Sequence, residues 1–286
     1  MTEWQWWCAA RADVWTWTWQ PYPGVWIIVG LALLGLTMLN RPGEPSTNAV
    51  MLPPPSVWSR VSMTLGLLLL WAALDWPVGA LGAGYLASVH AVQFVVLAMM
   101  VPALLLGGIG PAGRYRLTQY RLAQHRLLAI GARVWQRMTS PAVAMALFAG
   151  VMIVSHLPPV ADALVASATG SFVLDMSWLV SGLAFAWPLI MPRSEVPSET
   201  YLSPLMRIGY LFAGTIAHVF IGMWLLVADY PLYATYELAP PLGVLSPRMD
   251  QQVAGGVMLL LGTPLVVIAI GLQFRELGSE ANPETL

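Results

Sequence analysis

Seven long apolar segments run along this chain, and each is long enough, or nearly so, to cross a lipid bilayer as a helix. They are Val25–Leu39, Val57–Trp76, Leu86–Ile109, Ser140–Leu157, Phe172–Met191, Leu205–Ala228 and Val253–Phe274. Only 9% of the 286 residues are charged and 58% are hydrophobic, too few charges to cover a water-facing surface. The sequence therefore predicts an all-α fold, a polytopic membrane helix bundle of seven transmembrane helices.

The arginines give this bundle a direction, because basic residues gather in cytoplasmic loops. All 13 basic residues are Arg; with the N-terminus outside, 11 fall on the cytoplasmic side and only Arg11 and Arg248 fall outside. We therefore expect an outside N-terminus and a cytoplasmic C-terminus. The expected organisation is a Trp-rich interfacial segment over residues 1–24, a membrane domain over 25–274 with a cytoplasmic amphipathic helix at 114–138, and a cytoplasmic tail at 275–286.

Two segments outside the spans are expected to contact membrane lipid. Residues 1–24 contain six Trp, whose indole rings settle at the level of the lipid headgroups. Segment 114–138 interleaves Arg with Tyr, Leu and Trp, a pattern typical of an amphipathic helix lying on anionic headgroups. The alternatives are stacking of a ligand on the Trp-rich segment and docking of a partner subunit on the Arg-rich one.

Charge and cysteine usage exclude several classes of function. The formal net charge of −1 gives no basic excess that would attract nucleic acid, so we expect no nucleic-acid partner. The single Cys8 excludes an iron–sulfur cluster and a cysteine-based zinc site, which need several thiolates. The sequence contains no hydrolytic triad pattern and no Gly-rich phosphate loop, so we expect no enzymatic activity.

Ionisable side chains gather in one half of the predicted bundle. The direction given above and a rise of about 1.5 Å per helical residue place six of them near the outer surface: Asp75, His90, His156, Asp175, Asp229 and Asp250. His218 lies deeper, roughly 15 Å below the outer end of its span, and only His125 belongs to the cytoplasmic helix. This distribution indicates a polar site open to the outer compartment, without a polar path across the membrane.

Metal binding is one use for these groups, since imidazole, carboxylate and thioether are metal ligands and thioethers favour Cu(I). The candidate ligands are His90, Met152, His156, Asp175, His218 and Asp250, and copper is the expected metal. Structural roles are the alternative: hydrogen bonds between helices for His and Asp, core packing for Met, and a cap on its own helix for Asp250. Gln93, one turn below His90, joins the site as a supporting residue.

Five stretches of the sequence carry a likeness to a known family. They are HAVQFVVLAMMVPALLLGG (90–108), SHLPP (155–159), SGLAFAWPLIMP (181–192), PLYATY (231–236) and DQQVAGGVM (250–258). In this order they resemble the CtaG-type cytochrome c oxidase assembly factors. The resemblance implies a multi-pass protein of the bacterial plasma (inner) membrane that helps to form active haem–copper cytochrome c oxidase, assisting copper delivery from the outer face, with oxidase subunits as partners.

The resemblance also assigns individual positions. His90, Asp250 and Gln252 match motif positions of the family, and Asp229, Tyr233 and Tyr236 lie in or beside the PLYATY motif as supporting residues. The family usually reads H-x-x-x-H in its third span, whereas this chain has Phe94 at the second His position. Phe cannot bind a metal, so two alternatives follow: a scaffold role without direct copper binding, or use of His156 or His218 in its place.

Other functions fit parts of the pattern. A copper or small-solute transporter would use Pro102, Pro188 and Pro264 to break helices near the midplane, although no ionisable residue lines the inner half. A structural membrane subunit of a respiratory complex is a further alternative. We expect no haem, because paired His ligands at two depths are missing from the inner half.

Overall fold

A computed structural model describes residues 5–41, 53–119, 126–191, 201–243 and 245–281, and within these ranges the chain is helical and contains no strand. Two helices run unbroken through a π-helical turn. The elements are α1 (Pro23–Leu39), α2 (Val57–Leu74), α3 (Val78–Gly84), α4 (Ala87–Val95) continuing through η1 (Val96–Met100) into α5 (Val101–Gly107), α6 (Pro111–Gln119), α7 (Arg126–Met138), α8 (Pro141–Ser155), α9 (Pro158–Val165), α10 (Ala168–Ile190), α11 (Pro204–Val227), α12 (Ala234–Glu237), and α13 (Pro247–Val257) continuing through η5 (Met258–Gly262) into α14 (Thr263–Ala281).

Five of these helices are long and apolar enough to span a membrane, so the chain is a multi-pass membrane protein. They cover residues 57–74, 87–107, 168–190, 204–227 and 247–274. A sixth candidate is the pair α7 and α8, which bends by 79° at its break. Helix α1 is apolar but has only 17 residues. The structure therefore confirms the all-α bundle and supports five or six of the seven expected spans.

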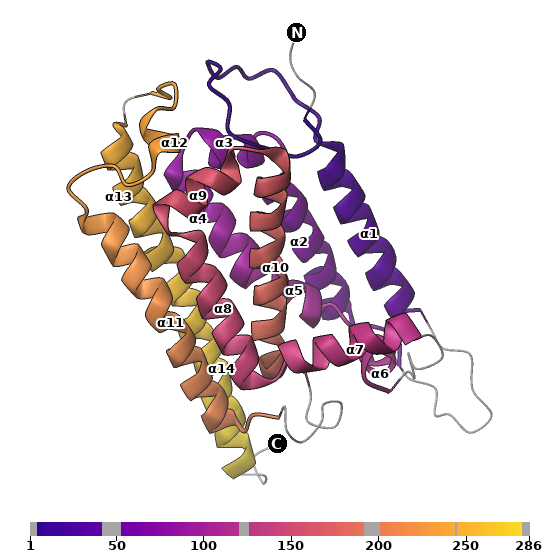
Figure 1. The fold of residues 1–286 in the computed structure, drawn as a ribbon. Helices are drawn as coiled ribbons and strands as arrows, with labels where there is room; N and C mark the ends of the chain where they lie inside the picture. The colour runs from indigo at the N-terminus through magenta and orange to yellow at the C-terminus, as the bar shows by residue number, and fades with distance from the viewer. Residues whose placement is uncertain (1–4, 42–52, 120–125, 192–200, 244, 282–286) are drawn as a thin grey trace.

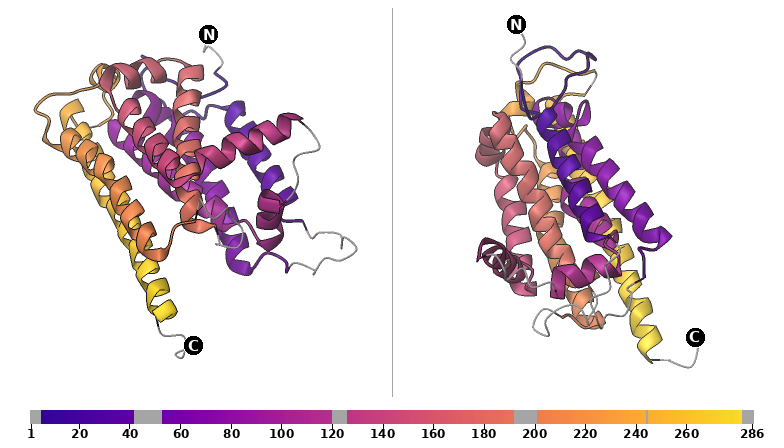
Figure 2. Two further views of the ribbon diagram at one scale, coloured as in Figure 1. Left: turned by 60° about the horizontal axis from the view of Figure 1, so that its bottom comes forward. Right: turned by 90° about the vertical axis from the view of Figure 1, so that its right-hand side faces the viewer.

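The helices stand side by side, with the N-terminus and the C-terminus at opposite ends (Figure 1). Helix α10 packs against α5, α8 and α9, and α11 packs against α8, α13 and α14. Helix α1 lies at the edge of the bundle, as the turned views in Figure 2 show. Its main packing partners are α2 and α6. The short helices α3, α9 and α12 cover the end that carries the N-terminus, which we call the N-terminal end of the bundle.

Four of the long helices, α2, α10, α11 and α13, begin directly after a Ser that caps their first turn. The side chains of Ser56, Ser167, Ser203 and Ser246 each accept a hydrogen bond from the backbone N–H three residues on, which satisfies a free donor of the first turn. The cap at Ser246 starts the last long helix at Pro247, six residues before the expected Val253. The expected span begins at Val253 because it counts only the apolar run, whereas the helix also includes the polar Asp250 and Gln251, which are buried inside the bundle.

The Arg-rich segment contains two helices in place of the single expected helix at 114–138. Helix α6 ends at Gln119 and α7 begins at Arg126, and His125 lies outside the described residues. Helix α7 runs across the C-terminal end of the bundle, roughly perpendicular to α8 (Figure 1). The last helix also continues through Ala281.

The Trp-rich segment folds back onto the N-terminal end of the bundle. Trp7 and Cys8 are buried in the core, whereas Trp17 and Trp19 are exposed. The Ala10 N–H donates to the carbonyl of Val165 at 2.8 Å, which fixes the segment to α9. The segment was expected to lie only at the membrane interface. In the structure, part of it also packs into the N-terminal end of the bundle.

Candidate functional site

A small cavity lies between helices at the N-terminal end of the bundle. Its volume of about 10 Å³ is the room of a single water-sized sphere. It is lined by Ala87, His90 and Ala91 of α4, Ser155 and His156 at the end of α8, Ala161 of α9, Leu225 of α11, Tyr233 and Tyr236 at α12, and Ala254 of α13. The structure therefore brings two of the predicted ligands, His90 and His156, to one cavity.

The two imidazoles of the cavity share an aromatic neighbour. Trp178 of α10 packs against His90 with ring centroids 5.0 Å apart and against His156 with centroids 6.3 Å apart. The indole N–H of Trp178 donates to the Ser155 hydroxyl at 2.9 Å. The rings of Phe94 and His156 lie nearly perpendicular to each other, with centroids 4.8 Å apart. The position where the family usually has its second His is thus in contact with the His156 ring.

A backbone hydrogen bond fixes the tautomer of His156. Its Nδ1 lies 2.8 Å from the carbonyl oxygen of Met152. A carbonyl can only accept, so Nδ1 carries the proton and Nε2 carries the lone pair. Orientation of a His by a second group in this way is typical of imidazoles that bind metals. Met152 itself is fully buried in the core and contributes this carbonyl.

Two tyrosines close the cavity from the short helix α12. The Tyr233 hydroxyl donates to the carbonyl of His156 at 2.9 Å, and the Tyr236 hydroxyl donates to the carbonyl of Gly82 at 2.7 Å. Burial raises the pKa of both phenols above the usual value. Both side chains therefore stay neutral and act as donors that hold α12 over His90 and His156.

Asp250 positions the helix that carries His90. Its carboxylate accepts hydrogen bonds from the backbone N–H groups of Ala87, at 2.6 Å, and Ser88, at 3.3 Å, and from the Ser88 hydroxyl. A carboxylate at the first turn of α4 is favourable because the free N–H groups there carry partial positive charge. Asp250 therefore caps a neighbouring helix, while Ser246 caps its own.

Two glutamines tie the surroundings together. Gln251, which sequence reasoning passed over, accepts a hydrogen bond from the N–H of Leu232 at 2.7 Å and donates to the carbonyl of Tyr230 at 3.3 Å. It thereby holds the chain that leads into α12, whereas the expected Gln252 is only half-buried. Gln93 donates to the carbonyl of Ala73 at 2.8 Å and so joins α4 to α2.

The remaining predicted residues lie elsewhere. The carboxylate of Asp175 accepts a hydrogen bond from the Trp7 indole at 2.8 Å and anchors the N-terminal segment. Asp229 forms an exposed ion pair with Arg248 at 3.0 Å.

His218 belongs to α11 and lies against η5, outside the cavity. Its Nε2 donates to the carbonyl of Met258 at 2.7 Å, at the first residue of the π-helical turn. Its Nδ1 is buried and has no hydrogen-bond partner. Across the described residues, no three His, Cys, Asp or Glu side chains come close enough to hold one metal ion. The six predicted ligands thus do not form a single cluster; His90 and His156 alone share the cavity.

Comparison with known protein families adds to this geometry. The model of the family described as cytochrome c oxidase caa3 assembly factor (Caa3_CtaG) matches residues 33–278. The chain belongs to this family. The matched range includes α4, α8 and α12, which bring His90, His156, Tyr233 and Tyr236 to the cavity, and α11 and α13, which complete its lining.

Individual relatives come from mycobacteria. Uncharacterised proteins of Mycobacterium bovis and Mycobacterium tuberculosis are each 29% identical over 237 residues, which is 74% of this chain and 34% of theirs. An uncharacterised protein of Mycobacterium leprae is 28% identical over 192 residues, 64% of this chain and 28% of its own. The chain thus spans about a third of the length of the curated relatives it matches. No solved structure shows a significant match to the chain.

Proposed function

We propose that this protein is an assembly factor for a caa3-type cytochrome c oxidase in the bacterial plasma membrane and that it passes copper to the oxidase from the outer face. Copper is its cargo, and the His90–His156 pair is the docking point. The observation that carries the proposal is the pairing itself, with the Nε2 lone pair of His156 made available by the bond from its Nδ1 to Met152.

The chemistry of this pair suits a cargo ion better than a resident one. Imidazole nitrogens bind copper well, but two neutral imidazoles and no carboxylate give a smaller affinity than a complete ligand set. A site of this kind would take up and release the ion. Phe94, in contact with His156, supports the use of His156 in place of the missing second His of the family pattern.

The proposed topology has seven spans, with the cavity end outside. Helix α1 is about 26 Å long and α8 about 23 Å at about 1.5 Å per residue. Both lengths are short of the roughly 30 Å hydrocarbon core, a mismatch that local thinning of the bilayer accommodates. The Arg residues near the opposite end support a cytoplasmic position for that end.

Copper binding tests the proposal directly. The purified full chain, titrated anaerobically with Cu(I) against a competing chelator, should bind one ion. We expect His90→Ala and His156→Ala each to weaken binding by at least tenfold, and His125→Ala to leave it unchanged. Phe94→His, which restores H-x-x-x-H, should tighten binding. Equal affinity of the wild type and both alanine variants would exclude the pair as the copper site.

A cellular experiment tests the client. A strain lacking this protein should contain the oxidase polypeptides with a substoichiometric copper content, measured on the purified oxidase. Wild type and His125→Ala should restore the copper content, whereas His90→Ala should not. Full copper content in the deletion strain would contradict the proposed function.

A further inference from the structure

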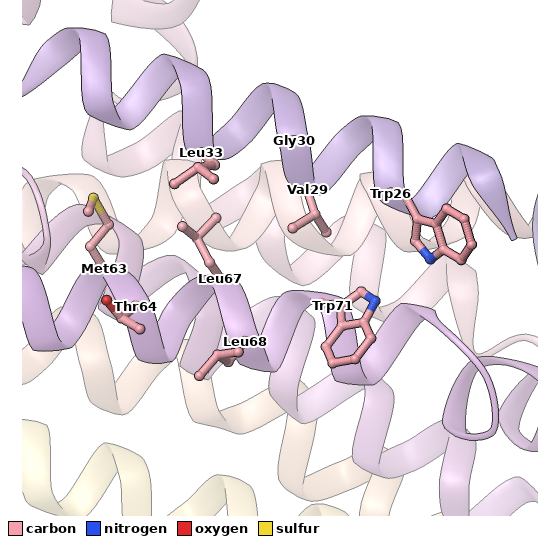
Figure 3. A pocket seen from close by; sticks show the side chains of 9 residues that line it. All are labelled: Trp26, Val29, Gly30, Leu33, Met63, Thr64, Leu67, Leu68 and Trp71. Atoms are coloured by element: carbon pink, nitrogen blue, oxygen red, sulfur yellow. The ribbon is translucent and has the colours of Figure 1, made fainter. Parts of the chain in front are cut away.

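An open apolar groove separates α1 from α2 on the outside of the bundle. Its volume is about 470 Å³. Figure 3 shows its walls, which are formed by Trp26, Val29, Gly30 and Leu33 of α1 and by Met63, Thr64, Leu67, Leu68 and Trp71 of α2. The residues of each wall recur at helical spacing and so form one continuous face on each helix. The two antiparallel helices thus form the two walls of one open groove.

The walls offer almost nothing to a polar ligand. The indole N–H groups of Trp26 and Trp71 both donate to Oδ2 of Asp75 at 2.8 Å. The Thr64 hydroxyl donates to the carbonyl of Arg60 at 2.9 Å. With these donors engaged, the walls present carbon and the Met63 thioether. An occupant of this groove is therefore a hydrocarbon.

Polar links fix α1 at both ends of the groove. At the N-terminal end, Asp75 joins Trp26 to Trp71. At the other end, Asn40 exchanges hydrogen bonds with the carbonyl of Gly108, at 3.1 Å, and the N–H of Gly110, at 2.8 Å. The groove between these links is built into the fold, since both ends of α1 are fixed by hydrogen bonds.

Positive charge lies at the C-terminal end of the groove. Arg60 is four residues before Thr64 and so lies on the same face of α2, one turn beyond the apolar wall, where it is exposed. Arg41 is exposed just after α1. Nη1 of Arg116 donates to the carbonyls of Met38 and Leu39 at the end of α1, at 3.1 and 2.6 Å. The described segments 23–41, 53–74 and 101–119 contain no Asp or Glu to neutralise these guanidinium groups.

The groove has the length of an acyl-chain site. Its α2 wall runs from Met63 to Trp71, eight residues or about 12 Å along the helix, and its α1 wall runs from Trp26 to Leu33, about 10 Å. An elongated apolar groove of this length takes part of one extended acyl chain, with the headgroup beyond its end.

We propose that this groove is a binding site for one anionic phospholipid, with an acyl chain between α1 and α2 and the headgroup phosphate at Arg60, Arg41 and Arg116. Basic pockets between transmembrane helices are suited to acidic headgroups, and Arg binds phosphate through two parallel N–H groups. The bound lipid completes the contact between α1 and the rest of the bundle.

Native mass spectrometry of the full chain in detergent tests the site. The probes are phosphatidylglycerol and phosphatidylcholine with identical acyl chains. We expect the first phosphatidylglycerol to bind about tenfold more tightly than phosphatidylcholine, since hydrogen bonds to a charged group are the stronger kind. Arg60→Gln should abolish this preference. Gly30→Leu should weaken binding of both lipids, because Gly30 lines the groove and a Cβ placed there has no atom within 4 Å, so the new side chain occupies groove space.

Two matched variants control for general effects. Gly35→Leu makes the same change on α1 at a position that also has open space but does not line the groove. Arg137→Gln removes an exposed charge from α7 near the same end of the bundle. Both should bind phosphatidylglycerol as the wild type does. Equal binding of the two lipids by the wild type, or an equal loss in Arg137→Gln and Arg60→Gln, would overturn the proposal.

Discussion

Single polar side chains at the N-terminal end of the bundle mostly hold helices in place. Asp75 joins two indoles, Asp175 holds Trp7, and Asp250 caps α4. From the sequence, the natural cap for Asp250 is its own helix, and only the packing of α13 against α4 reveals the true partner. A carboxylate near a helix start is recognisable in sequence; which helix start it serves depends on tertiary structure.

The role of Asp250 leads to a stability prediction. Asp250→Ala leaves the Ala87 and Ser88 N–H groups without their acceptor, and we expect a loss of about 1–3 kcal/mol. Unfolding of the purified protein by SDS in mixed micelles measures the loss. Asp229→Ala is the control: its ion pair with Arg248 is largely exposed, so its loss should cost less than about 1 kcal/mol. A similar small effect of both substitutions would contradict the capping role.

Helices were more predictable than the segments that connect them. The apolar runs placed α1, α2, α8, α10 and α11 within a few residues of their bounds, because a span must be about 20 apolar residues long. The π-helical turns η1 and η5 and the short helices α3, α9 and α12 carried no such signal. For the site, depth along the spans places His90 and His156 at one level and His218 deeper, and the structure has the first two on one cavity and His218 outside it. Depth does not reveal that the carboxylates at the same level serve other helices, nor the part played by Gln251.

The folded-back N-terminal segment makes a prediction for Cys8, the only cysteine of the chain. Its thiol is buried and donates to the carbonyl of Leu74. Burial, followed by the nearby carboxylates Asp175 and Asp75, raises its pKa well above the ordinary value. The thiolate is the reactive form, so the native protein should react slowly with iodoacetamide even at pH 9, where an ordinary thiol of pKa about 8.5 is mostly ionised.

Loosening the segment should expose this thiol. Trp7→Ala removes a fully buried indole and its bond to Asp175, and we expect Cys8 alkylation to accelerate more than tenfold, measured by mass spectrometry at pH 8. Trp17→Ala removes an equal side chain that is 71% exposed and should leave the rate unchanged. Fast alkylation of the wild type would show that the segment does not pack onto the bundle as described.

The arrangement of the entire bundle in the membrane depends on whether α1 and α8, which are shorter than the other spans, cross the bilayer. If α1 crosses, Val14 and Arg41 face opposite compartments. If α8 crosses together with α10 and α11, Arg137 and Asp229 also face opposite compartments, whereas without α8 they share one. All four residues are exposed, so a cysteine at each position can report its side of the membrane.

A Cys8→Ser background, which has no other cysteine, makes this test unambiguous. In intact cells a membrane-impermeant maleimide should label Val14→Cys and Asp229→Cys, while Arg41→Cys and Arg137→Cys should react only after the membrane is opened. The physical reason is the accumulation of Arg at the end of the bundle that carries residues 41 and 137. Labelling of Val14→Cys and Arg41→Cys from the same side would show that α1 does not cross the membrane. Labelling of all four positions in the reverse pattern would show that the His90–His156 cavity faces the cytoplasm, and it would exclude copper delivery from the outer face.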